Sequence, residues 1–163
     1  MTFEQYQYES LKTDIRDKDI RLLCDICGLI EEYGELEEKI KKQAPIEDIM
    51  DEAGDIMWYI ASFCNERQLD LQSIVATVSY PKQQNIFRLA GILKKTYRDH
   101  KKVLSYDYET EIVRFIAFVI NERLMQITLP FDEFGIHEIM RRNVVKLQDR
   151  LNRGKIKGDG DNR

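Results

Sequence analysis

The chain has few residues that interrupt helices and few that form disulfides: three prolines, eight glycines and three cysteines among 163 residues. So few prolines and glycines favour long helices, and three cysteines argue against a disulfide framework. Charged residues interrupt the longest apolar runs, which excludes a membrane-spanning helix. The first residues have neither the basic nor the apolar region of a secretory signal. We therefore expect a cytoplasmic protein.

Apolar residues make up 43% of the chain and charged residues 33%, which is typical of one ordered domain. No segment shows the sustained alternation of a strand, so the predicted fold class is all-α, a helical bundle. We expect one domain over residues 1–152 and a basic, glycine-containing tail over 153–163. Cys24 and Cys27 form a C-x-x-C inside an apolar helical pattern, which favours core packing over metal binding.

An internal similarity divides the domain further. Residues 55–67 (DIMWYIASFCNER) align without gaps on residues 111–123 (EIVRFIAFVINER), and six of the thirteen are identical. This predicts a pseudo-duplicated helix pair, with copy one at about 18–67, copy two at about 83–126 and a closing helix at about 132–151. Chance similarity between amphipathic helices is the alternative.

Two short acidic motifs carry most of the functional information, E-E-x-x-E at residues 31–35 and E-x-x-D at residues 52–55. Residues three apart lie on neighbouring parts of one helical face. If the two helices pack antiparallel, four carboxylates converge, and their repulsion requires a neutralising cation. Hard divalent ions that prefer oxygen, chiefly Mg²⁺, meet that requirement.

A run of glutamates is also typical of a solvated helix face, and the Glu-then-Lys spacing near residue 35 fits that interpretation. Two details favour a site instead. Glu32 interrupts an apolar stripe between Leu29 and Leu36, and Asp55 precedes the large aromatic residues Trp58 and Tyr59. We therefore expect these acids to be partly desolvated. The corresponding positions of copy two have lost three of the four carboxylates, so we expect a single acidic site.

Charge is unevenly distributed. Residues 141–163 carry a net charge of +5, whereas the first 140 residues carry −9. A basic end next to an acidic body suits phosphate binding beside a metal, and a solvated helix end is the plainer interpretation. Nucleic-acid binding is the poorer hypothesis, since the body is acidic and no reader motif is present.

These features together resemble a known family. TFEQYQYESLKTD near the start, GLIEEYGELEEKIKK and DEAGDIMWYIASFC in the middle, and NVVKLQDRLNRGKIKGDGDNR at the end are similar to the MazG-like branch of the all-α nucleotide pyrophosphohydrolases. The resemblance implies hydrolysis of a nucleoside triphosphate to its monophosphate and pyrophosphate, in nucleotide-pool control. It also implies Mg²⁺, with Mn²⁺ as a second candidate, bound by Glu32, Glu35, Glu52 and Asp55. Glu31 is the candidate catalytic residue, for orienting or deprotonating water, and an exposed supporting role stays open for it.

Binding of the substrate needs cations as well. By the resemblance, Lys146 and Arg150 match a K-x-x-x-R element and Asn143 is a matching polar residue for phosphate or sugar. Weaker candidates are Lys155, Lys157 and Arg163 in the tail, and Trp58 and Tyr59, for which stacking on a base competes with core packing. The resemblance also implies a homodimer or homotetramer.

The residues bear on two alternative functions. A di-iron carboxylate bundle requires Glu-x-x-His pairs, but Tyr97 and Phe134 stand three residues before the two histidines, His100 and His137. A non-enzymatic regulatory or adaptor module of the same fold stays open. No motif indicates which base or sugar is preferred.

Overall fold

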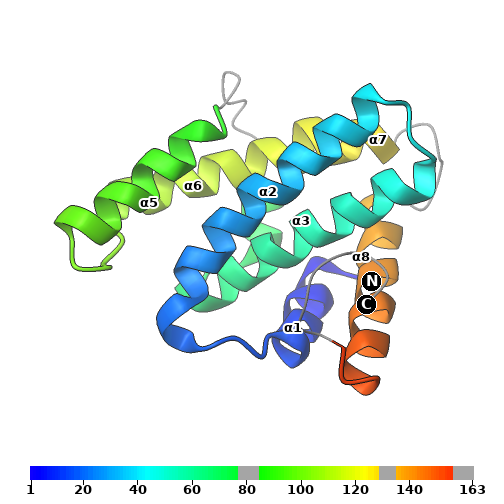
Figure 1. Cartoon of the computed structure of the whole chain (residues 1–163), viewed down its shortest axis with the longest axis horizontal. Helices are drawn as coiled ribbons and strands as arrows, with labels where there is room; N and C mark the ends of the chain where they lie inside the picture. Colours follow the sequence, from blue (N-terminus) through cyan, green and yellow to red (C-terminus); the bar gives the residue numbers. More distant parts are fainter. Residues whose placement is uncertain (77–84, 129–134, 156–163) are drawn as a thin grey trace.

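The computed structural model describes residues 1–76, 85–128 and 135–155, and every regular element in these ranges is helical (Figure 1). This confirms the all-α prediction. The elements are α1 (Phe3–Thr13), the short 3₁₀ turn η1 (Lys18–Ile20), α2 (Arg21–Lys41), α3 (Ile46–Arg67), α4 (Leu71–Ala76), α5 (Phe87–Asp99), α6 (Tyr106–Phe118), the π-helical segment η2 (Val119–Leu124), α7 (Met125–Thr128) and α8 (Gly135–Asn152).

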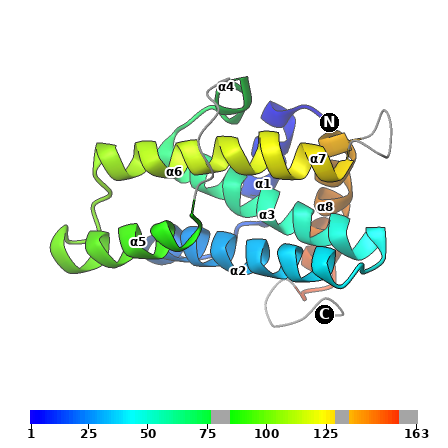
Figure 2. The ribbon, with the colours of Figure 1, turned by 90° about the horizontal axis from the view of Figure 1, so that it is seen from above.

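Two antiparallel helix pairs form the centre of the molecule. In Figures 1 and 2, α3 runs back along α2, α6 runs back along α5, and α5 lies beside the first half of α2. Helix α2 packs against both α3 and α5. This agrees with its two apolar stripes, because a helix with one neighbour needs only one. Helices α1 and α8 pack against α3 and against each other.

The repeated segments occupy corresponding positions, since each belongs to the second helix of its pair. Ile56 and Ile60 in α3 are fully buried, as are their counterparts Ile112 and Ile116 in α6. The copies diverge further along, where α3 stays α-helical but the second copy becomes the π-helical η2.

One expectation about the core was wrong. Cys27 is exposed and Cys24 is only partly buried, so this C-x-x-C lies at the edge of the core. Residues three apart lie on neighbouring parts of one helical face, and an apolar pattern does not show how far the neighbouring helices cover that face. Cys64 in α3 is fully buried.

Helix α2 lies close to the Tyr59 side chain of α3 at Gly28. A Cβ atom built at Gly28 would lie 2.2 Å from Cζ of Tyr59, well inside van der Waals contact. Tyr59 is held in turn by an edge-on contact with the ring of Trp58, at a centroid separation of 5.1 Å. The missing side chain at Gly28 therefore gives the Tyr59 ring its place against α2, one turn from Glu32.

We predict that Gly28→Ala lowers the melting temperature, since the Tyr59 ring must leave its position and overpacking of this kind costs about 1–3 kcal/mol. Gly34→Ala is the matched control on the same helix, because a Cβ there meets nothing within 4 Å. The control should stabilise the chain by about 0.5–1 kcal/mol through higher helix propensity. Thermal unfolding followed by circular dichroism measures both. Equal melting temperatures for the two variants would show that the ring moves freely.

Candidate metal and phosphate site

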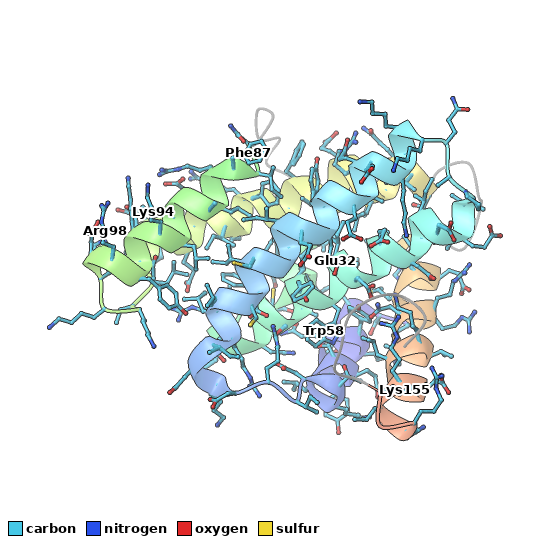
Figure 3. The ribbon with its side chains drawn as sticks, in the orientation of Figure 1. Glu32, Trp58, Phe87, Lys94, Arg98 and Lys155 are labelled. Carbon is cyan, nitrogen blue, oxygen red and sulfur yellow. The ribbon has the colours of Figure 1, made fainter. Side chains whose placement is uncertain are left out.

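Glu32, Glu52 and Asp55 converge between α2 and α3. Each offers a carboxylate oxygen, and these oxygens lie within 4.8 Å of one another. Glu52 is 2% exposed, and Glu32 and Asp55 are partly buried. The expected desolvation is therefore present. Figure 3 shows Glu32 between the two helices, near the middle of the molecule.

The crowding has an electrostatic consequence. Burial, a hydrogen bond to Glu52 and the negative charges of its acidic neighbours raise the pKa of Glu32 to about 9. Burial also raises the pKa of Asp55, and the Lys146 ammonium opposes that rise. Without a divalent ion, the cluster thus retains a proton that an isolated carboxyl would release at neutral pH.

Glu35 and Glu31 stand apart from these three residues. Both are exposed on α2, and neither belongs to the group of converging carboxylates found in the described ranges. Glu35 is still close enough for its negative charge to contribute to the raised pKa of Glu32.

Two lysines from different helices neutralise the buried carboxylates. Lys39, near the end of α2, forms an ion pair with Glu52. Lys146 of α8 places its Nζ 2.7 Å from Oδ2 of Asp55. Both ammonium groups are largely shielded from solvent, with side chains 26% and 18% exposed. Sequence reasoning missed Lys39, although its spacing of seven residues from Glu32 puts the two on one helical face and was the available signal.

Helix α8 reaches the cluster through Asn143. Its Nδ2 donates to Oδ1 of Asp55 (2.8 Å), and its Oδ1 accepts from the hydroxyl of Tyr6 (2.8 Å). Both Tyr6 and Asn143 are buried. Gly54 permits this approach, because a Cβ there would lie 3.0 Å from Cβ of Asn143. The N-terminal helix, the second acidic motif and the C-terminal element therefore meet at Asp55.

The remaining basic candidates are less closely associated with the carboxylate cluster. Arg150 is 3% exposed, and its positive charge acts to lower the pKa of Asp55. Lys155 is exposed after the end of α8, away from Glu32 in Figure 3. The predictions for Lys157 and Arg163 lie outside the described residues.

The two aromatic candidates already have partners. Nε1 of Trp58 donates to Oγ1 of Thr13 (2.9 Å), and the guanidinium of Arg16 lies 4.6 Å from the centre of the Trp58 ring. Tyr59 packs on Gly28, and burial beside Glu32 raises the pKa of its hydroxyl to about 12. Arg16 was not anticipated, because it lies outside both acidic motifs and reaches Trp58 only through the tertiary fold.

The donor set suits a hard divalent cation. All three groups are carboxylates, and oxygen ligands of this kind are those that Mg²⁺ and Mn²⁺ take in proteins. Metal binding would also relieve the repulsion that raises the pKa of Glu32.

Residues 26–82 match a family model, that of the MazG nucleotide pyrophosphohydrolase domain. This segment, a minor part of the chain, is similar to that domain. The segment holds both acidic motifs but not Asn143, Lys146 or Arg150, which lie beyond it. No curated protein and no solved structure matches the chain.

The second copy has no comparable acidic group among the described residues. Its Glu111, the counterpart of Asp55, forms a two-pronged ion pair with Arg88 at 2.7 and 2.8 Å on the surface. The remaining carboxylate of copy two is thus neutralised by an arginine of the same copy. No helix in the described ranges combines the length and apolar character needed to cross a membrane.

We predict that Glu32→Gln stabilises the metal-free protein at alkaline pH. The pKa of Glu32 is about 9 in the folded chain, against an ordinary value of 4.5 for a glutamate. The unfolded state releases the Glu32 proton at a lower pH than the folded state does. The free energy of unfolding of the wild type therefore falls as pH rises between these two values, and a glutamine has no such proton. In EDTA, the variant should melt at the wild-type temperature near pH 5. Near pH 8–9 it should melt about 2–4 °C higher, the shift that about 1 kcal/mol gives in a domain of this size.

The matched control for that measurement is Glu38→Gln, an exposed glutamate of the same helix that pairs with Lys42. Its effect should be small throughout, because exposed ion pairs contribute little. Addition of Mg²⁺ should then stabilise the wild type more than Glu32→Gln. An equal response of both proteins to Mg²⁺ would contradict a role for Glu32 in metal binding.

Proposed function

We propose that the chain hydrolyses a nucleoside triphosphate between its α and β phosphates, releasing the monophosphate and pyrophosphate. The observation that carries the proposal is the convergence of Glu32, Glu52 and Asp55 with the ammonium groups of Lys39 and Lys146. Carboxylates and amines at one place serve the two needs of phosphoryl chemistry, a divalent ion and a cationic grip on phosphate oxygens. The match to a nucleotide pyrophosphohydrolase domain supports the same reaction.

Glu32, Glu35, Glu52 and Asp55 are the proposed metal ligands. A Mg²⁺ or Mn²⁺ ion held there would neutralise phosphate oxygens and lower the pKa of water. Asn143 fixes the direction of the Asp55 carboxylate through its amide. Tyr6 in turn fixes Asn143.

In the reaction, the oxygen of a water molecule bonds to the α phosphorus. The bond from that phosphorus to the bridging oxygen breaks, and pyrophosphate leaves with the electron pair. We assign Glu31 to orient the water and accept its proton, a role for which its place beside Glu32 on α2 is the support. The water proton then passes from Glu31 to solvent.

Lys146, Arg150 and Asn143 are proposed to hold phosphate or sugar. Trp58 and Tyr59 are the proposed stacking surface for the base, and Lys155, Lys157 and Arg163 would attract the anionic substrate from a distance. We expect a deoxynucleotide or a non-canonical nucleotide as substrate, a cytoplasmic location and a homodimer or homotetramer.

Glu52→Gln should abolish hydrolysis. Loss of a partner that merely supports a metal ligand costs about 10–100-fold, so loss of a ligand should lower kcat by about 100-fold or more. The assay incubates the protein with Mg²⁺ and a panel of nucleoside triphosphates, then separates pyrophosphate from orthophosphate. Glu111→Gln is the matched control and should keep full activity, because Glu111 pairs with Arg88 on the surface.

The products distinguish the alternatives. Orthophosphate together with a nucleoside diphosphate would contradict cleavage between the α and β phosphates. Inactivity toward every nucleotide, with normal folding, would favour the regulatory or adaptor module.

A further inference from the structure

Lys39 is engaged at the site although neither acidic motif includes it. It approaches Glu52 from α2, while Lys146 approaches Asp55 from α8. The two ammonium groups thus reach two carboxylates of the cluster from different helices. Each ammonium group is at the end of a flexible four-carbon side chain, so it can change partners without a change in the backbone.

These ion pairs compete with a divalent cation. An ammonium in hydrogen-bond contact with a carboxylate takes up the oxygen lone pairs that a metal requires, and its positive charge repels the metal. Metal binding at Glu52 and Asp55 therefore has to displace both ammonium groups. Once displaced, they stay tethered beside the site, where phosphate oxygens are the natural new partners.

We propose that Lys39, together with Lys146, is an exchangeable counter-ion that neutralises the carboxylates when the metal is absent and transfers to the polyphosphate when the metal binds. The inference rests on the proposed function for the identity of the anion. Metal and polyphosphate then bind with positive coupling, because each stabilises the arrangement that the other needs. Lys39 thereby becomes an anion-binding residue, in addition to Lys146 and Arg150.

The exchange predicts opposite effects on two affinities when Lys39 is replaced by methionine. Mn²⁺ alone should bind about three- to tenfold more tightly to Lys39→Met, because no ammonium has to be displaced from Glu52. The preformed complex of Mg²⁺ with a non-hydrolysable α,β-methylene triphosphate should bind about tenfold more weakly, because one phosphate contact is lost. Electron paramagnetic resonance of free Mn²⁺ measures the first affinity, and titration calorimetry measures the second.

Lys42→Met is the matched control, because it removes the same charge near the same end of α2. Lys42 pairs with Glu38 on the surface. It should change neither affinity. Lys39→Arg keeps the positive charge and should restore the wild-type Mn²⁺ affinity. If Lys39→Met fails to fold, Lys39→Gln replaces it with the same expected signs.

The signs decide the outcome. A role confined to packing would weaken both affinities, and a role confined to phosphate would leave Mn²⁺ binding unchanged; either result overturns the exchange. Failure of the proposed function is separable from this. Absence of hydrolysis with opposite shifts in the two affinities would overturn the reaction and keep the exchange, whereas hydrolysis without those shifts would overturn the exchange alone.

Discussion

Like charges brought together inside a protein must be neutralised, and this constraint governs the contact between α2 and α3. Glu32, Glu52 and Asp55 present oxygens within 4.8 Å of one another at a place that is largely shielded from solvent. Lys39 and Lys146 supply two positive charges there, and the raised pKa of Glu32 keeps a proton on the third carboxyl. The two ion pairs and the retained proton thus reduce the negative charge of the metal-free site.

The surrounding structure serves to hold that arrangement. Gly28 leaves room for the Tyr59 ring, and Gly54 lets Asn143 of α8 come within hydrogen-bond reach of Asp55. A side chain at Gly28 would meet the Tyr59 ring, and one at Gly54 would crowd Asn143. The second copy shows the converse, since Glu111 is neutralised by Arg88 at the surface and forms no such group with other described residues.

Much of the fold was predictable from sequence. The rarity of proline and glycine, the helical periodicity and the repeat predicted an all-α chain with two related helix pairs, because these signals are local. The acidic motifs likewise predicted desolvated carboxylates from the apolar neighbours of Glu32 and Asp55. The exposure of Cys27 was not predictable, since it depends on which flank of α2 the other helices leave open.

The sequence by itself determined the class of fold and the chemical character of the site, because carboxylate spacing on a helix follows from helical geometry. Only the tertiary structure decided which cations neutralise those carboxylates. Asp55 and Lys146 are separated by 91 residues along the chain and Lys39 and Glu52 by 13, and no local pattern encodes either pairing. Each depends on where α2, α3 and α8 cross, which is set by the packing of their apolar faces.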